Sequence, residues 1–345
     1  MAGTRNNSNR ATIAAIALGR RAPGLLGCCG QTQDQSMTKF PRGTTATPAS
    51  IVDALNAVAG ERTKVRASFA AGQCVHGTYI PSDRSVEITK SRSFSRPSRV
   101  LARFSMDGCN PELSGADRLS LRGFSFRLGR DDYCSDILTQ SAPVHFARTL
   151  DQMQAYLKAR IPDPKGKLDT DKVKAFSAAN PETLSQADYL ATSQLPTGFA
   201  GATYWGVHSY PATNADGETR FIKLKVVPVG ADLAANADEA TTKSAGTIYD
   251  DLRNRIAAGE VRFSLIALLD RPNDPVLDVT IRWPDEDSRD EIRLGTIVIT
   301  GVEANAVCDA SVFDPANLAE GLDHPLDEIF AARRAAYAIS LARRR

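Results

Sequence analysis

The 345-residue sequence lacks any apolar run near the roughly 18–20 residues that a membrane-spanning helix requires, so no membrane span is expected. It also lacks an excess of charge, since 42 Lys and Arg stand against 40 Asp and Glu. Hydrophobic residues make up 42% of the chain and charged residues 24%, which is ordinary for a soluble globular protein. This composition excludes a disordered chain, a collagen-like chain and a small disulfide-rich protein.

The net charge of +2 comes from one end of the sequence. Residues 1–36 carry a net charge of +3, from four Arg against Asp34, which leaves −1 for the rest of the chain. The folded part is therefore nearly neutral, and no basic face for binding nucleic acid is indicated. A GxGxxG or GxxxxGKS/T motif is also absent, so nothing in the sequence indicates a nucleotide-binding loop.

The cysteines are scattered and form no CxxC pair. In a chain of this length we predict that they are reduced thiols rather than a disulfide framework or a zinc site. The six are Cys28, Cys29, Cys74, Cys109, Cys134 and Cys308.

The first residues differ in composition from everything after them. A secretory signal has its charges before the apolar run, but Arg20 and Arg21 follow the run ATIAAIALG. The stretch LLGCC at 25–29 resembles a lipoprotein cleavage site, and a transit-like presequence or a true start at Met37 fits as well. We therefore predict that residues 1–46 are a disordered leader or a misassigned start. A cytoplasmic location is expected, or a periplasmic or organellar one if the segment is a genuine presequence.

From Thr47 onward the sequence becomes regular. TPASIVDALNAVAG has a Pro suited to a first turn and an apolar face, which predicts a helix that stops at Gly60. Further helices are expected at about 149–160, 244–258 and 327–345. Strands are expected at 65–80, 99–105, 121–128, 143–147, 202–210, 219–228, 261–269, 277–283 and 292–299. Because the strands come in mostly consecutive runs, we expect an α+β fold with an antiparallel barrel.

The last predicted helix carries the first chemical signal. Arg333 and Tyr337 are four residues apart, so both side chains lie on one helix face. A guanidinium beside a phenol favours the ionised phenol, and a phenolate is a good ligand for ferric iron. By itself, such a pair is usually surface packing.

The motifs of residues 47–345 make this pair more informative, because their order resembles the catalase superfamily and its short catalase-related peroxidases. The resemblance implies a catalase-like antiparallel β-barrel with flanking helices, a haem b cofactor, and a C-terminal helix that carries the haem ligand. The segments that carry it are KVRASFAAG (64–72), RVLARFS (99–105), LRGFSFRL (121–128), QSAPVHFAR (140–148), YWGVHSYPATNADGE (204–218), VRFSLIALLDRPNDPVLDVTIRWP (261–284) and the terminal FDP and ARRAAYAISLARR.

On the side of the iron ligand, the resemblance makes Tyr337 the axial ligand and Arg333 its hydrogen-bonding partner. His208 would lie behind Arg333, with Asp327 as a further member of this proximal network. Such outer partners fix the orientation and basicity of a ligand.

Around the ring, the resemblance assigns Arg66 and Arg103 to the haem propionates, because the guanidinium fork suits carboxylates. Phe146 would pack near the porphyrin. Taken from the sequence alone, a strand Arg is usually on the surface and such a Phe is usually in the core.

The sequence departs from the family where the peroxide proton is managed. Phe69 occupies the position of the distal His, and Ser141 that of the distal Asn, while Ser105, the usual partner of that His, remains. A phenyl ring has no lone pair, so it cannot provide the positioned proton transfer that is worth about 10²–10⁴ in rate. His76 and His145 are both expected to point away from this position.

Two classes of function follow from this departure. The first is a haem enzyme that acts on peroxide or an organic, fatty-acid-like hydroperoxide, with poor dismutation of hydrogen peroxide. The second is a haem-binding carrier or small-ligand sensor without peroxide turnover, or a haem enzyme of repurposed chemistry. A haem-free structural relative is a third reading, disfavoured by the complete proximal set. The expected partners are the peroxide substrate and, as one possibility, a second copy of the chain in a homodimer, with no nucleic acid.

Overall fold

The computed structural model describes residues 45–60, 64–107, 120–193, 198–230, 245–259, 261–310 and 312–345. All of them belong to one compact unit, Phe40–Arg345. The predicted leader 1–46 lies outside the described residues, except for its last two. Thr45 and Ala46 already belong to the fold, because their backbone amides donate to the Asp151 carboxylate at 2.9 and 2.7 Å.

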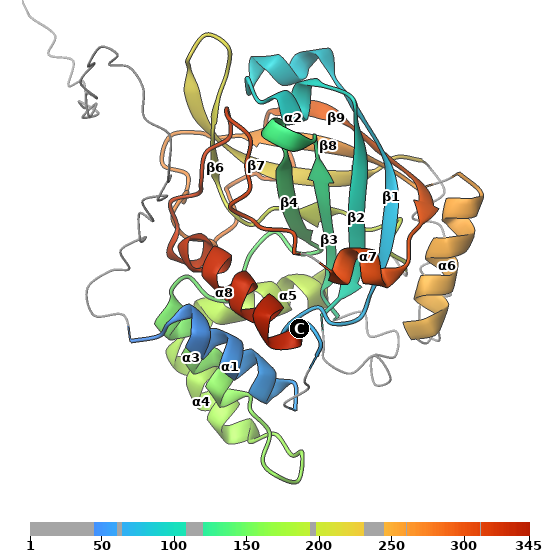
Figure 1. Cartoon of the computed structure of the whole chain (residues 1–345). Helices are drawn as coiled ribbons and strands as arrows, with labels where there is room; N and C mark the ends of the chain where they lie inside the picture. Colours follow the sequence, from blue (N-terminus) through green and yellow to red (C-terminus); the bar gives the residue numbers. More distant parts are fainter. Residues whose placement is uncertain are drawn as a thin grey trace, which may run out of the picture. The chain divides into compact units, whose positions relative to one another are not determined.

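The described strands form one antiparallel sheet that closes into a barrel (Figure 1). Its order is β5-β4-β3-β2-β1-β9-β8-β7-β6, and β5 also pairs with β7, which joins eight of the strands in a ring. The predicted antiparallel barrel is therefore confirmed. The strands are β1 (Gly72–Pro81), β2 (Ser98–Met106), β3 (Arg122–Leu128), β4 (Ser135–Gln140), β5 (Tyr204–Trp205), β6 (Tyr210–Thr213), β7 (Thr219–Pro228), β8 (Arg262–Leu269) and β9 (Glu291–Val302).

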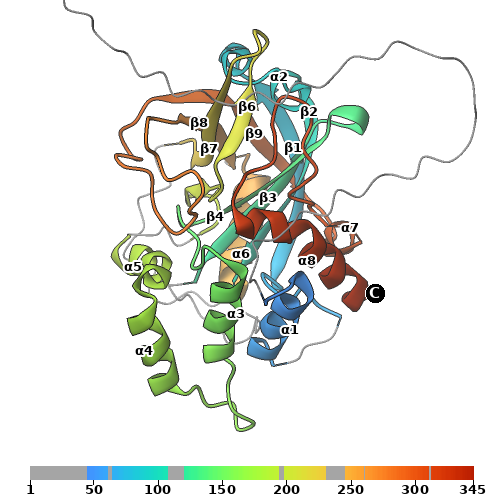
Figure 2. The ribbon, with the colours of Figure 1, turned by 90° about the vertical axis from the view of Figure 1, so that its left-hand side faces the viewer.

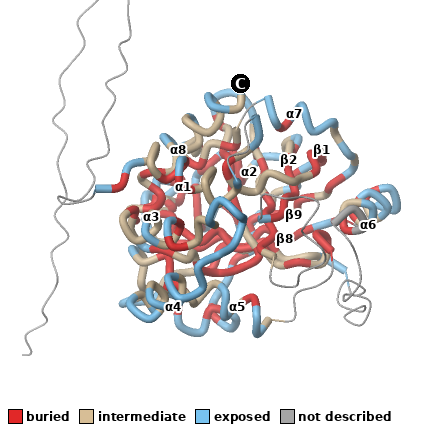
Figure 3. The backbone as a smooth tube through the Cα atoms, turned by 90° about the horizontal axis from the view of Figure 1, so that it is seen from below, coloured by how far each residue is buried: buried red, intermediate tan, exposed pale blue. Residues whose placement is uncertain are grey.

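Successive residues of β2 alternate between the apolar core and the outer face of the barrel. Ala102 and Phe104 are fully buried in the main apolar core, where Phe104 stacks on Phe124 of β3 at 4.4 Å between ring centroids. Arg103 and Ser105 point to the opposite face, because successive strand residues alternate. Buried residues follow the strands in Figure 3, whereas α4 has no buried residue. The outer face of β2 is therefore left to carry polar groups.

Helices α1, α3 and α8 pack together beside the barrel (Figures 1 and 2). Their shared apolar cluster includes Ile51, Leu150 and Ala332. The described helices are α1 (Pro48–Val58), α2 (Arg92–Ser95), α3 (Leu150–Ala159), α4 (Thr170–Ala179), α5 (Ser185–Thr192), α6 (Ala245–Ala257), α7 (Asn305–Asp309) and α8 (Glu328–Arg344). The four predicted helices are confirmed, while α2, α4, α5 and α7 were not predicted. None of the described helices is both long and apolar enough to cross a membrane.

The start of the first helix follows from its sequence. Thr47 caps α1, since its hydroxyl accepts from the Ser50 amide while the Ser50 hydroxyl accepts from the Thr47 amide. Pro48 occupies the first turn, and Gly60 follows the helix with a φ of +76°, a conformation that glycine adopts easily.

Two predicted strands are wrong. Residues 143–147 form no strand, because Pro143 has no amide for a ladder and the Val144 carbonyl accepts side-chain amides instead. Residues 277–283 form turns, in which the Asp278 carboxylate accepts from the Thr280 amide.

The prediction of reduced thiols is also wrong for two cysteines. Cys74 of β1 and Cys308 of α7 form a disulfide, with their Cα atoms 5.8 Å apart. They are separated by 234 residues, so only the fold brings them together. Cys134 is a free thiol, and the other three cysteines lie outside the described residues.

Candidate active site

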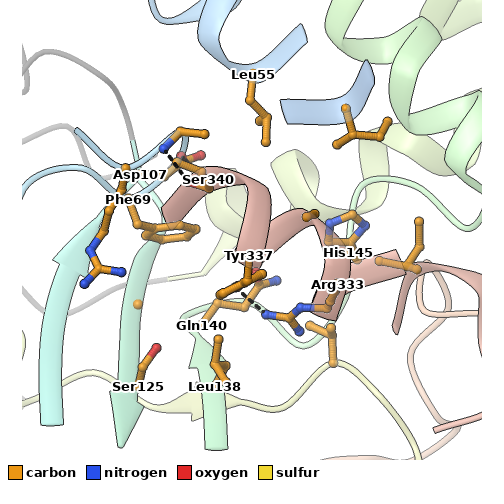
Figure 4. A pocket seen from close by; sticks show the side chains of 18 of the residues that line it. Leu55, Phe69, Asp107, Ser125, Leu138, Gln140, His145, Arg333, Tyr337 and Ser340 are labelled. Atoms are coloured by element: carbon orange, nitrogen blue, oxygen red, sulfur yellow. Dashed lines mark hydrogen bonds between the residues drawn. The ribbon is translucent and has the colours of Figure 1, made fainter. Parts of the chain in front are cut away.

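A cavity lies between the outer face of the barrel and the helices α1, α3 and α8 (Figure 4). Alternate residues of three neighbouring strands form its wall, because they point to the same side of the sheet. These strand residues are Arg103 and Ser105 of β2, Gly123 and Ser125 of β3, and Leu138 and Gln140 of β4. The helices contribute mainly apolar side chains, among them Ile51, Leu55, Leu150, Met153 and Ala336.

Tyr337 enters this cavity from α8. The helix begins at Asp327, whose carboxylate accepts from the Phe330 amide at 2.8 Å. One turn before Tyr337, Nη2 of Arg333 donates to the phenol oxygen at 2.9 Å. The predicted pair is therefore in contact, and both residues line the cavity.

Behind Arg333 the predicted network is complete. Nη1 of Arg333 lies 2.8 Å from Nε2 of His208, and Nδ1 of His208 lies 2.8 Å from the Asp327 carboxylate. Because a guanidinium can only donate, Nε2 must accept, and the imidazole proton therefore sits on Nδ1 and is donated to Asp327. The three hydrogen bonds that join Tyr337, Arg333, His208 and Asp327 therefore determine which nitrogen of His208 carries the proton.

Burial sets the charges of this network. Burial lowers the pKa of the fully buried His208, and the neighbouring Asp327 only partly offsets this, so the ring stays neutral. Burial opposes ionisation of Asp327, yet His208 and the Phe330 amide hold the pKa of its carboxyl below its usual range. Burial likewise opposes the charge on Arg333, but Tyr337 beside it outweighs burial and raises the pKa of the guanidinium.

Three arginines line the cavity in a common cluster. Arg103 donates to the backbone carbonyls of Phe69 and Ala70, at 2.9 and 2.8 Å. Burial, together with the charges of Arg66 and Arg344, lowers the pKa of Arg103 to about 10. Cations that repel one another in this way favour binding of an anion. Arg66 and Arg103 were predicted, and Arg344 was missed.

The sequence contained a signal for Arg344. It follows Tyr337 by seven residues, so two helical turns bring it back to the same face of α8. Burial lowers its pKa to about 10, and the charge of Arg66 contributes in the same direction. Arg66 itself donates to the Cys308 carbonyl at 2.7 Å and to the Asp309 carboxylate at 3.2 Å.

Phe69 forms an apolar wall of the cavity. Its ring packs against an apolar cluster that includes Leu121, and it lies so close to Gly123 that a Cβ there would meet the ring carbons at 3.2 Å. The same Cβ would meet the Ser105 hydroxyl at 2.7 Å, so only glycine fits between them. Phe69 has a φ of +52°, which is uncommon for a bulky side chain, and Arg103 holds its carbonyl.

The other predicted distal position is arranged differently. Ser141 is fully buried, its hydroxyl accepts from the Arg122 amide at 2.9 Å, and it is not among the residues that line the cavity. The side chain of the preceding residue, Gln140, lines the cavity instead and donates to the Val144 carbonyl at 2.8 Å. The structure therefore puts Ser141 behind the wall.

Phe146 and His145 line the cavity, whereas His76 does not. Phe146 lines the cavity and stacks on His145 at 4.3 Å between ring centroids. His145, which was expected to point away, also lines the cavity, but beside Arg333 and not beside Phe69 (Figure 4). His76 pairs with Glu303 at 2.9 Å and does not line the cavity, as expected.

Comparison with known proteins identifies the family to which this chain belongs. A family model for catalase matches residues 26–345. The chain belongs to the catalase family. A catalase-related peroxidase of Synechococcus elongatus is 28% identical over 306 residues, which span 87% of this chain and 89% of the relative. A catalase-related peroxidase of Mycolicibacterium paratuberculosis is 26% identical over 300 residues, which span 86% and 94%.

Solved catalases share the fold. A fungal catalase superposes with a TM-score of 0.69 at 21% identity, and catalase A from Saccharomyces cerevisiae with 0.68 at 20%. Each superposition covers 85% of this chain but only 62% and 64% of the solved chains, so this chain spans less than two thirds of their length.

Catalase-family proteins are haem-dependent, and the residues of the cavity fit a haem. The phenol oxygen of Tyr337 accepts from Arg333, which leaves a further lone pair for a metal ion. Arg66, Arg103 and Arg344 are opposite in charge to the two propionates of a haem, and the helix side chains supply the apolar surface that a porphyrin covers.

Proposed function

We propose that the protein is a haem b enzyme of the catalase-related peroxidase type that takes an organic hydroperoxide in preference to hydrogen peroxide. The observation that carries this proposal is one cavity with two unlike sides. On one side, a row of hydrogen-bonded side chains ends at Tyr337; on another, the apolar ring of Phe69 forms the wall, at the position that the resemblance assigns to the distal base. Family membership supports an oxidoreductase that acts on peroxide.

The residues of this chain would hold the cofactor by charge and shape. Tyr337 would ligate the iron, the three arginines would bind the propionates, and Phe146 would pack against the porphyrin. When bound, ferric haem supplies the electrons that cleave the O–O bond of a peroxide.

The proximal residues would hold the phenol oxygen of Tyr337 in place as a ligand. Arg333 donates to this oxygen and has no lone pair that could accept a hydrogen bond from it. His208 fixes the plane of the guanidinium by accepting from its other nitrogen, and Asp327 fixes His208. Each member therefore orients the next, and the phenol oxygen is the last atom of the row.

The distal residues would select the oxidant. Phe69 cannot take the proton of hydrogen peroxide, so dismutation should lose the roughly 10²–10⁴-fold that a positioned base contributes. A hydroperoxide with an apolar tail gains from burying that tail against Phe69 and Leu121, at about 25 cal/mol per Å². The apolar surface of this cavity thus favours a larger, fatty-acid-like oxidant over hydrogen peroxide.

For the location of the protein, we propose an oxidising compartment. The Cys74–Cys308 disulfide supports this, because disulfides persist outside reducing cytosol. The periplasmic or organellar alternative is therefore preferred over the cytoplasmic one. Titration of free thiols in protein taken directly from its native cell tests this, and four or fewer titrating thiols out of six are expected.

The function is tested by haem reconstitution followed by two oxidants. Wild-type protein should give a high-spin ferric spectrum with phenolate charge-transfer bands, and Tyr337→Phe should lose them. Tyr133→Phe, outside the cavity, is the matched control. Cumene hydroperoxide should then change the haem spectrum faster than hydrogen peroxide does.

The other outcomes each have a meaning. A wild-type protein that stays colourless with haem contradicts the proposal altogether. Haem binding without a reaction toward either oxidant would instead favour the carrier or sensor, which the missing distal base also suggests. Fast dismutation of hydrogen peroxide would contradict the role given to Phe69.

A further inference from the structure

The cavity still needs a group that can take a proton from the substrate. Phe69 has none, and the two nitrogens of His208 are both engaged by Arg333 and Asp327. His145 lies beside Arg333, and its Nδ1 is 2.8 Å from the Ala147 carbonyl. Neither imidazole is therefore placed at the side of the cavity that Phe69 forms.

Asp107 is the one carboxylate among the described residues that line the cavity. It follows β2 directly, and Arg103, Ser105 and Asp107 are alternate residues along the chain, which all line the cavity. The Ser105 hydroxyl and the Phe69 ring both border the space that a Cβ of Gly123 would fill. Asp107 therefore continues the row of side chains that leads from the arginines past Phe69.

Two contacts fix Asp107 at this end of the cavity. Its carboxylate accepts from the hydroxyl of Ser68, the residue before Phe69, at 3.3 Å. Its amide donates at 2.7 Å to the carbonyl of Leu121, a member of the apolar cluster against which the Phe69 ring packs. The side chain of Asp107 lines the cavity and is exposed, so it lies at an edge of the cavity that solvent reaches.

We propose that Asp107 is the proton acceptor for the hydroperoxide, in place of the missing distal histidine; this inference rests on the function proposed above. In the step, the O–H bond of the hydroperoxide breaks and an O–H bond forms on the Asp107 carboxylate, directly or through one water molecule. One proton moves and no electron is transferred. The peroxide anion so formed is the species that a ferric haem held by Tyr337 would take up.

Cyanide provides a test that does not depend on turnover. Hydrogen cyanide must lose a proton before it binds ferric haem as an anion, so a nearby base speeds its association. We compare haem-loaded wild type, Asp107→Asn, Asp107→Glu and the control Asp216→Asn, which removes an equal charge from an exposed turn outside the cavity. The measurements are haem content, the rate of cyanide association and the rate of the spectral change with cumene hydroperoxide.

Asp107→Asn should keep its haem and lower both rates at least roughly tenfold, since positioned proton transfer is worth about 10²–10⁴. Asp107→Glu should recover a large part of both rates, and Asp216→Asn should match wild type. Equal rates in wild type and Asp107→Asn, with haem bound, would overturn the proposal while leaving the haem enzyme intact. A loss confined to the hydroperoxide would also overturn it, because Asp107 would then contact the substrate without taking its proton. Failure of wild type to bind haem would instead remove the proposed function, and this proposal with it.

Discussion

Arg333 donates to the phenol oxygen of Tyr337 at 2.9 Å, from one turn earlier on the same helix. The contact needs no help from the rest of the fold, because residues four apart on a helix face each other. What the fold adds is His208, which accepts from the other nitrogen of Arg333 and holds the guanidinium in this orientation.

Replacing Arg333 should therefore weaken retention of haem, most at mildly acid pH. Arg333→Ala removes the cation that stabilises the phenolate, so protons compete better with iron. A hydrogen bond to a charged group is worth about 1.5–3 kcal/mol, which corresponds to a roughly 10- to 100-fold loss of affinity. The rate at which haem transfers to apomyoglobin, measured at pH 5 to 8, reports this loss of affinity. Arg334→Ala, whose side chain is exposed, is the control, and equal retention in both variants would show that Arg333 has no such role.

Restoring a base at position 69 should raise dismutation of hydrogen peroxide. In Phe69→His the imidazole would lie beside the Ser105 hydroxyl, which already faces the ring. We expect a gain of at least roughly tenfold, below the full range for a positioned base, because residue 69 keeps an unusual backbone conformation. Oxygen evolution measures the rate. Adding Ser141→Asn should contribute little, since Ser141 is turned toward the Arg122 amide and away from the cavity. No gain from Phe69→His would mean that this ring does not lie over the reacting peroxide.

Removing the disulfide should lower both stability and haem retention. Replacing Cys74 and Cys308 together by Ser opens a link across 234 residues, which should cost roughly 2–5 kcal/mol in the free energy of unfolding. Haem retention should fall as well, because the Cys308 carbonyl and Asp309 both bind Arg66. Urea unfolding and haem transfer are the measurements, with Cys134→Ser as the control. If wild type loses no stability in a thiol reductant that is shown to free these two cysteines, the prediction fails.

The free energy of unfolding should fall as the pH falls from about 6.5 to about 4. Burial lowers the pKa of His145 to about 4, while an unfolded His titrates near 6.5. Between these values the unfolded chain binds a proton that the folded chain does not, so stability rises with pH across this window and is lost below it. His208 acts in the same direction, because burial lowers its pKa too. Urea midpoints across this range should vary less in His145→Asn than in wild type, and an unchanged slope would contradict the assignment to His145.

Local patterns in the sequence determined the elements that carry the site. The proline in the first turn of α1, the glycine after this helix and the pattern of residues 99–105 are all short-range features, and each predicted its element correctly. The spacing of Arg333 and Tyr337 placed both on one face of α8 before any fold was known. The resemblance to catalases then indicated His208 and Asp327, which lie together in the structure.

Only the tertiary structure determined the contacts between segments that are far apart in the sequence. The Cys74–Cys308 bond and the contact between His208 and Arg333 join residues 234 and 125 positions apart, and no local spacing encodes such pairs. The burial of Ser141 behind the cavity wall depends on the strand β4, which the sequence did not reveal. That Asp107 lines the cavity follows only from the tertiary structure, because the closed barrel places the outer faces of β2, β3 and β4 against the helices. Periodicity says which side of an element a residue takes, whereas barrel closure and helix packing decide what that side meets.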